Sequence, residues 1–223
     1  MIEFPSNGST AVGYLATPPG GSGPGLIVIQ EWWGLVDHIR DVCDRFAAAG
    51  FVALAPDLYH GRTIAEPDEA GKAMMAMKMD LAARDMSGAV DEVVRRSGAS
   101  HIGVIGFCMG GGLALVLATQ RPDAVAAVVP CYGVIPWPDA QPDYSALSAA
   151  VLGHYASDDG FFTPEAAEAL GEQLRGLGKE VEIIVYPGTD HAFFNDTRPE
   201  VYNAHAAAAL WERSLAFFHD HLD

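Results

Sequence analysis

Residues 102–115 read IGVIGFCMGGGLAL, in which an apolar run meets a glycine-rich turn and a second apolar run follows. The pattern predicts a buried strand, a sharp turn and a helix, with Cys108 at the tip of the turn. Gly106 and Gly110 stand two residues before and two residues after the cysteine, where a side chain would collide with a neighbouring strand or helix. The spacing G-x-C-x-G is typical of a strained turn that presents a nucleophile.

The position of Cys108 favours reactivity, because the N–H groups and the positive dipole end of a helix N-terminus stabilise a thiolate. A glycine-rich turn can also cradle a phosphate, but the segment has neither G-x-G-x-x-G nor G-K-[ST]. Cys43 and Cys131 lack a glycine signature and are expected to be small buried hydrophobes. The three cysteines are widely spaced and form no CxxC pair, so neither a disulfide framework nor a metal site is expected.

On both sides of this segment, short apolar runs alternate with helical patterns. Strands are expected at Ile2–Phe4, Ala11–Ala16, Leu26–Gln30, Phe51–Ala55, His101–Gly106, Val125–Cys131, Ala149–Tyr155 and Val181–Tyr186. Helices are expected at about His38–Ala49, Glu69–Arg96, Gly110–Gln120, Pro164–Leu177 and Glu200–Leu222. Apolar strands separated by helices require a mostly parallel sheet covered on both faces. We therefore predict one α/β domain over residues 1–223, with an open, doubly wound sheet flanked by helices.

Composition narrows the possible partners of this chain of 223 residues. Lys plus Arg number 13 against 29 Asp plus Glu, and the formal net charge of −16 repels nucleic-acid phosphates and anionic membrane surfaces. The opening residues lack the basic start and apolar run of a secretory signal, and about 18 consecutive apolar residues occur nowhere. We expect a cytoplasmic protein that binds neither nucleic acid nor membrane.

In folds of this class, reactive side chains follow the carboxyl ends of the strands, which selects an acid and a base. Among the histidines after Cys108, His191 follows a strand through a short loop, whereas His154 lies inside a strand and is expected to be a packed, hydrogen-bonded residue. Asp158 and Asp159 both follow the preceding strand, and their spacing does not separate them. A carboxylate beside the histidine would orient the imidazole and stabilise its protonated form.

Five motifs in order carry a family resemblance over essentially the whole chain. They are Gln30–Leu35 (QEWWGL), Ala55–Tyr59 (APDLY), Gly106–Gly111 (GFCMGG), Asp159–Pro164 (DGFFTP) and Tyr186–Phe193 (YPGTDHAF). With these motifs the chain resembles the dienelactone hydrolase family, of the α/β-hydrolase fold without a large separate cap domain.

The resemblance implies a cofactor-independent hydrolase of esters or lactones, of the carboxymethylenebutenolidase type, that works through a thioester acyl-enzyme. By alignment to the family's motifs, the triad would be Cys108, His191 and Asp159 rather than Asp158. The resemblance also implies that Glu31 hydrogen-bonds the resting thiol, and that the backbone N–H groups of Trp32 and Met109 form an oxyanion hole.

One position departs from the family's pattern. Prototype members resemble one another in an Arg four residues beyond the catalytic His, which grips a substrate carboxylate, whereas this chain has Asn195 there and its nearest arginine is Arg198. A guanidinium matches a carboxylate in a way that an amide cannot, so an anionic substrate does not follow from the resemblance.

Candidate substrate contacts are aromatic or polar residues beside the predicted site loops. They are Trp33, Tyr132, Phe161, Phe193, Asn195 and Arg198. Five of the seven methionines fall between Met74 and Met86, which indicates either core packing or an adaptable apolar wall beside the pocket, with a role as a lid left open.

Three functions fit these residues. The leading one is hydrolysis of a small-molecule ester or lactone by a monomer or homodimer. A non-enzymatic ligand-binding protein on the same scaffold would explain the missing Arg. A redox-sensing thiol at Cys108 is the third, although a resolving cysteine is absent nearby in the sequence.

Overall fold

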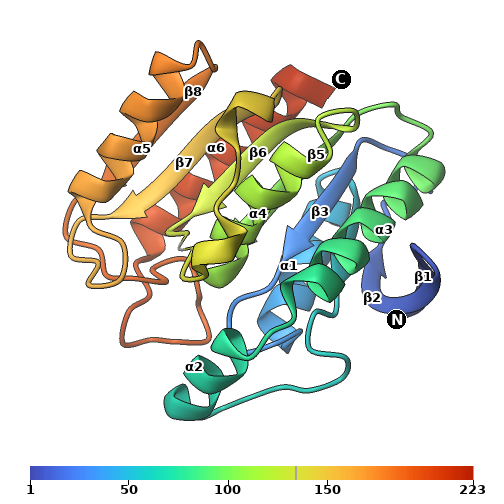
Figure 1. Ribbon diagram of the computed structural model, residues 1–223, viewed down its shortest axis with the longest axis horizontal. Coiled ribbons are helices and arrows are strands. Elements are labelled where there is room, and N and C mark those ends of the chain that lie inside the picture. Colours follow the sequence, from blue (N-terminus) through green and yellow to red (C-terminus); the bar gives the residue numbers. More distant parts are fainter. Residues whose placement is uncertain (134, 223) are drawn as a thin grey trace.

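The computed structural model describes residues 1–133 and 135–222, which form one eight-stranded sheet with helices on both faces (Figure 1). The strands are β1 (Ile2–Ser6), β2 (Ser9–Ala16), β3 (Gly25–Ile29), β4 (Val52–Pro56), β5 (Ile102–Phe107), β6 (Val125–Cys131), β7 (Ala150–Ala156) and β8 (Val181–Tyr186). The helices are α1 (Asp37–Ala48), α2 (Pro67–Met75), α3 (Met79–Ser97), α4 (Met109–Gln120), α5 (Pro164–Gly176) and α6 (Ala204–Leu222), with short 3₁₀ turns at Pro138–Ala140 and Tyr144–Ala146.

The sheet has the strand order β1-β2-β4-β3-β5-β6-β7-β8. β1 and β2 pair antiparallel with each other, and β2 pairs antiparallel with β4, whereas the strands from β4 to β8 are all parallel. The carboxyl ends of β3, β5, β7 and β8 therefore meet at one edge of the sheet, which is where ligands bind in open α/β folds. The predicted fold class, a doubly wound and mostly parallel sheet, is confirmed.

Helices cover the two faces in two layers. α1 and α6 pack together through Phe46 of α1, whose ring contacts Trp211 and Phe218 of α6. On the opposite face α3 packs beside α4 (Figure 1). Side chains on successive residues of β5 point to opposite faces, so the strands of the centre are buried on both sides, as their continuous apolar sequences require.

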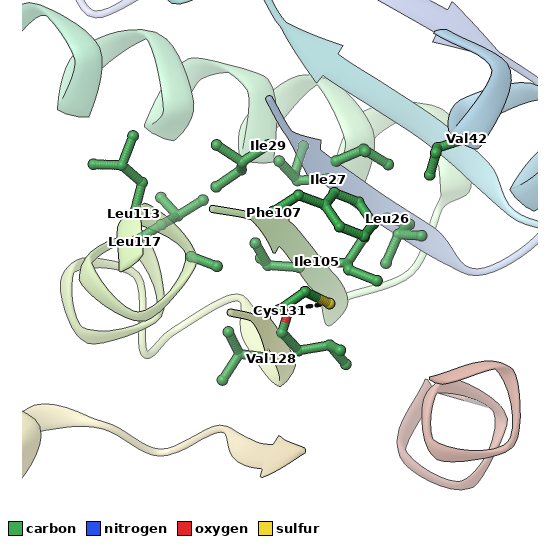
Figure 2. Close-up of a cluster of buried hydrophobic side chains, with 14 of the residues drawn as sticks. Leu26, Ile27, Ile29, Val42, Ile105, Phe107, Leu113, Leu117, Val128 and Cys131 are labelled. Atoms are coloured by element: carbon green, nitrogen blue, oxygen red, sulfur yellow. Dashed lines mark hydrogen bonds between the residues drawn. The ribbon is translucent and has the colours of Figure 1, made fainter. Parts of the chain in front are cut away.

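The core lies between β3, β5, β6 and the helices that cover them. Figure 2 shows Phe107 among aliphatic side chains of the two central strands, with Leu113 and Leu117 of α4 nearby. The labelled residues of β3, β5 and α4 are all fully buried. Burying this much apolar surface at the centre of the sheet anchors the turn that begins directly after Phe107.

The expected helix Glu69–Arg96 is wrong in one respect: α2 ends at Met75 and α3 begins at Met79. The backbone of Lys78 is extended, and the indole N–H of Trp137 donates to the carbonyl oxygen of Met74 at 3.1 Å. A side chain distant in sequence therefore donates a hydrogen bond to a carbonyl oxygen at the end of α2, and the chain turns there without Gly or Pro. The last helix begins at Ala204 rather than Glu200.

Candidate active site

Cys108 lies at the tip of a sharp turn between β5 and α4, as predicted. Its backbone has φ 53° and ψ −120°, a strained conformation for a residue other than glycine. A Cβ atom on Gly106 would overlap the carbonyl of Gly110, and one on Gly110 would lie 2.5 Å from the carbonyl oxygen of Gln30. The two glycines therefore let α4 begin directly against β3 and β5, with Cys108 as the residue before the first helical position.

The three cysteines differ in their surroundings. Cys108 is 7% exposed and lines a pocket, whereas Cys43 and Cys131 are fully buried. Burial raises the pKa of Cys43 and Cys131, with the charges of Asp44 and Glu31 adding to the effect, respectively. Cys131 is next to Cys108, whose N–H donates to its carbonyl oxygen at 3.0 Å, but its buried thiol is unsuited to form a resolving thiolate.

His191 and Asp159 form a hydrogen-bonded pair at the ends of β8 and β7. Nδ1 of His191 lies 2.7 Å from Oδ2 of Asp159, whose other oxygen accepts hydrogen bonds from the N–H groups of Phe161 at 2.7 Å and Phe162 at 3.1 Å. These two amides fix the carboxylate at the start of the loop, so that it faces the imidazole. The neighbouring Asp158 is exposed and accepts from the Ser157 hydroxyl instead.

The electrostatics of this pair are set by opposing effects. Burial lowers the pKa of His191, but its interactions with Asp159 and Cys108 raise it to about 10. Burial raises the pKa of Asp159, while the hydrogen bond and charge of His191 and the two backbone amides lower it, and the result is a lowered pKa. The arrangement favours a carboxylate beside a protonated imidazole.

The other ring nitrogen of His191, Nε2, is buried and accepts or donates no hydrogen bond among the described residues. Both His191 and Cys108 line the same pocket. Hydrogen bonds of catalytic pairs are often long in the unliganded state and shorten when substrate binds. The imidazole is thus oriented by Asp159 on one side and free to serve a reacting group on the other.

Glu31 follows β3 directly and is almost fully buried at 1% exposure. Its Oε2 atom accepts a hydrogen bond of 2.8 Å from Nδ2 of Asn195, and its Oε1 atom has no partner among the described residues. The described residues show no hydrogen bond between Glu31 and the Cys108 thiol. Glu31 and Cys108 nevertheless line the same pocket.

The two backbone N–H groups expected to form an oxyanion hole belong to Met109, which follows Cys108 in the chain, and to Trp32, which lines the same pocket as Cys108. Met109 is the first residue of α4, so its N–H has no acceptor within the helix. Trp32 follows Glu31 in the turn after β3, and its indole contacts the rings of Trp33 and Phe161. The Met109 N–H belongs to the turn between β5 and α4, and the Trp32 N–H belongs to the turn after β3.

A pocket of about 400 Å³ opens at this edge of the sheet. Its lining is mainly apolar, and consists of Glu31, Trp32, Trp33, Pro67, Met74, Cys108, Asp158, Gly160, Phe161, Asp190, His191, Ala192, Arg198 and Val201. Among the candidate substrate contacts, Trp33, Phe161 and Arg198 line it. Phe161 is 65% exposed and contacts the ring of His191, so it forms part of the rim.

The remaining candidates lie behind the pocket wall. Tyr132 and Phe193 are fully buried and pack against each other, with Tyr132 also touching the ring of His191. The backbone of Tyr132 has φ 39°, and its hydroxyl has no partner among the described residues. Asn195 is buried and bonded within the protein. Tyr132 and Phe193 thus pack behind the imidazole of His191, and Asn195 holds the carboxylate of Glu31. None of the three is among the residues that line the pocket.

Sequence patterns did not single out several residues of the site. Pro67 and Met74 come from α2, and Val201 comes from the loop before α6. Tyr59 lies 3.5 Å from the sulfur of Met109 through its hydroxyl, and burial together with Cys108 raises its pKa to about 12. Of these residues, Met74 belongs to the methionine cluster and Tyr59 ends the motif Ala55–Tyr59. Met74 lines the pocket and Met86 lies in the core, so the methionine group has both expected roles.

The described residues contain neither a metal-binding cluster nor a membrane-spanning helix. Within residues 1–133 and 135–222, no group of three or more His, Cys, Asp or Glu side chains is arranged to hold a metal ion. None of the helices in that part of the chain combines the length and apolarity needed to cross a membrane. His154 is fully buried between the Tyr186 hydroxyl at 2.9 Å and the Ser214 hydroxyl at 3.2 Å, the packed position that was expected for it.

Comparisons with known proteins agree on one family. The family model described as "Dienelactone hydrolase family" matches residues 12–222. "Protein usf" of Aquifex pyrophilus is 38% identical, covering 100% of this chain and 98% of the relative, and a "Putative carboxymethylenebutenolidase" of Aquifex aeolicus is 35% identical with the same coverage. A crystal structure of a "Putative Dienelactone Hydrolase" from Klebsiella pneumoniae is 31% identical, with a TM-score of 0.89 over 98% of this chain and 97% of the other.

Proposed function

The chain belongs to the dienelactone hydrolase family and is an ester or lactone hydrolase acting on small molecules, and on that premise we propose that it works through Cys108, His191 and Asp159. The observation that carries this proposal is the His191–Asp159 hydrogen bond of 2.7 Å, with His191 and Cys108 lining the same pocket. The three residues follow β5, β7 and β8, whose carboxyl ends lie at the same edge of the sheet.

In the first half-reaction, the Cys108 sulfur, whose proton has passed to Nε2 of His191, attacks the carbonyl carbon of the ester or lactone and forms a C–S bond. The N–H groups of Trp32 and Met109 hold the resulting oxyanion; loss of one such donor typically costs about 2.7–4 kcal/mol of transition-state stabilisation. When the C–O bond breaks, the leaving oxygen takes a proton from the His191 imidazolium. A thioester acyl-enzyme remains.

In the second half-reaction, His191 takes a proton from water, and the hydroxide oxygen attacks the thioester carbon. The C–S bond breaks, the acid product leaves, and the released Cys108 thiolate is again paired with the His191 imidazolium, which holds the proton taken from water. Asp159 keeps Nδ1 protonated throughout, so that Nε2 is the nitrogen that exchanges protons. Each step uses only groups of this chain, the substrate and one water molecule.

Glu31 has a supporting role in this proposal. Its Oε2 atom is held by Asn195, and its Oε1 atom is the free, buried acceptor within the same pocket as Cys108. A buried acceptor without a hydrogen bond costs free energy. A hydrogen bond to Oε1 from a thiol, or from a substrate group that enters the pocket, would therefore be favourable. Glu31 would then assist the loss of the Cys108 proton.

The first test replaces the nucleophile. Cys108→Ala should lower the turnover of para-nitrophenyl acetate to the uncatalysed rate, because no acyl-enzyme can form, while the circular dichroism spectrum and Tm stay close to wild type. Cys43→Ala is the matched control and should keep wild-type turnover, since its thiol is buried in α1 away from the pocket.

Trapping gives a second readout of the same proposal. Iodoacetamide should inactivate the wild-type enzyme with addition of one label at Cys108, and rapid quenching during turnover should reveal a Cys108 acyl adduct by intact mass. Undiminished ester turnover by Cys108→Ala would reject the mechanism. Reversible oxidation of Cys108 without any ester turnover would instead favour a thiol sensor.

A further inference from the structure

The pocket wall carries an unbalanced set of charges. Three carboxylates line it: Glu31 beside the nucleophile, and the exposed Asp158 and Asp190 toward the rim. Arg198 is the only Lys or Arg side chain among the described residues that line the pocket. The whole chain adds a formal charge of −16 to this local excess. An anionic group that enters the pocket therefore meets a negative field.

Arg198 is already paired within the protein. Its guanidinium lies 2.9 Å from Oε1 of Glu200, and it sits over the ring of Trp33 at 5.7 Å from the ring centroid. A substrate carboxylate would have to compete with Glu200 for this guanidinium. The charge of Arg198 is thus largely offset by Glu200, and that of the His191 imidazolium, the other cation of the lining, by its partner Asp159.

Asn195 is buried and is not among the residues that line the pocket. Its Nδ2 atom donates to Glu31 at 2.8 Å, and its Oδ1 atom accepts from the backbone N–H of Thr197 at 3.1 Å and from the Thr197 hydroxyl at 2.6 Å. Because each end of the amide has its own partner, the side chain cannot turn without breaking these three hydrogen bonds. Asn195 is a positioning residue for Glu31 and keeps that carboxylate at the pocket wall.

The rest of the wall suits a planar, apolar acyl group. Trp32, Trp33 and Phe161 form a continuous aromatic surface, with ring centroids 5.1 and 6.1 Å apart, and Met74 faces the same cavity. Apolar surface of this kind is buried favourably by an uncharged substrate, without the cost of desolvating a charge beside Glu31.

We propose that this enzyme selects esters or lactones whose acyl part is uncharged and apolar, and discriminates against those that carry a free carboxylate. The inference rests on the proposed function, because it concerns the substrate of the Cys108 site. It assigns the selection to the carboxylate wall of Glu31, Asp158 and Asp190, together with the pairing of Arg198 by Glu200.

The test compares two para-nitrophenyl esters with the same leaving group and chain length: the hexanoate and the mono-ester of adipate, which ends in a carboxylate. The wild-type enzyme should prefer the hexanoate in kcat/KM by about tenfold or more, equivalent to about 1.4 kcal/mol. The mixed methyl and para-nitrophenyl diester of adipate, which is polar but uncharged, should be hydrolysed at a rate closer to that of the hexanoate.

Glu200→Gln isolates the role of Arg198. This exposed substitution releases the guanidinium and should raise kcat/KM for the adipate mono-ester about two- to fivefold, the size expected for an exposed ion pair, with the hexanoate unchanged. Glu168→Gln is the matched control, because it removes the same charge from an exposed pair with Arg175 on α5 and should change neither value. Raising the ionic strength should narrow the wild-type preference.

The outcomes separate the two proposals. If Cys108→Ala is inactive and the wild-type enzyme hydrolyses the adipate mono-ester as well as the hexanoate, the substrate inference is wrong and the mechanism stands. If the methyl adipate diester is as poor a substrate as the mono-ester, polarity rather than charge governs selection, and the inference is also overturned. If no ester is hydrolysed through Cys108, both proposals fail.

Discussion

His191 lies between the carboxylate of Asp159 and the sulfur of Cys108, in a place where burial alone would keep an imidazole neutral. Its pKa is nevertheless raised to about 10, because the two neighbours outweigh the loss of solvation. The residue is therefore expected to contribute to stability in addition to its proposed catalytic role. Its folded-state pKa lies above the value of about 6.5 expected in an unfolded chain, and the difference fixes the sign of the pH dependence.

The stabilisation from the His191 proton should be fully present below about pH 6.5 and should be lost as the pH rises toward about 10, because the folded state then no longer binds the proton more tightly. We expect the Tm difference between wild type and His191→Gln to be larger at pH 6 than at pH 10, measured by differential scanning calorimetry.

An exposed histidine controls for this comparison. His205→Gln, at the start of α6, should give a Tm difference that stays small at both pH values. A Tm difference for His191→Gln that does not shrink between pH 6 and pH 10 would contradict the charged pair with Asp159.

At the level of single elements, the turn between β5 and α4 carries the site. The turn brings the first residues of α4 against the last residues of β3, so that the carbonyl oxygens of Ile29 and Gln30 occupy the space that a side chain at position 110 would need. The strain at Cys108 persists because the buried strands on both sides hold the turn in place. Local geometry and catalytic geometry are thus coupled in one element.

Gly110→Ala should lower the free energy of unfolding by about 1–3 kcal/mol or more, because the new methyl group meets backbone atoms that cannot move away easily. It should also reduce ester turnover, since Cys108 and the Met109 N–H shift together. Urea unfolding followed by circular dichroism measures the first effect, and an aryl ester assay measures the second.

Gly176→Ala supplies the comparison for a glycine without such contacts. A Cβ atom there would meet nothing within 4 Å, and the residue ends α5 at the surface. Stability should stay equal or increase slightly, by up to about 1 kcal/mol, and activity should be unchanged. Equal effects of the two substitutions would show that the close approach at Gly110 is unimportant.

The whole molecule combines a large apolar sheet core with a strongly acidic surface. The central strands β3, β4 and β5 are buried along their entire lengths, whereas the formal net charge is −16. Self-repulsion of this size opposes the compact state without affecting which fold forms. The same excess of negative charge extends to the pocket. The net charge of the chain and the carboxylates of the pocket would therefore both disfavour an anionic substrate.

Salt should therefore stabilise the protein. Raising NaCl from about 10 mM to about 500 mM at pH 7.5 should increase the Tm by a few degrees, because the repulsion between surface carboxylates is screened. The increase should become smaller near pH 5, close to the sequence pI of about 4.7, where the net charge is low. A Tm that falls with added NaCl at pH 7.5 would contradict a role for net charge.

Much of this architecture is readable in the chain, because it depends on near neighbours. Apolar runs predict the eight strands of the sheet to within two residues at each end, for example β6 at Val125–Cys131 and β8 at Val181–Tyr186. The glycine spacing around Cys108 predicts the turn, and chain order directs attention to His191. These features follow from backbone geometry and side-chain alternation over short stretches.

Packing between distant segments decides the rest. Asp159 meets the imidazole of His191, 32 positions away, and Asp158 does not. α2 ends and the chain turns toward α3 next to Met74, whose carbonyl oxygen accepts a hydrogen bond from the indole N–H of Trp137. Glu31 is held by a residue 164 positions away rather than by the nearby thiol. Such contacts arise only when the strands align at one edge of the sheet, and periodicity along the chain carries no information about which side chains then meet.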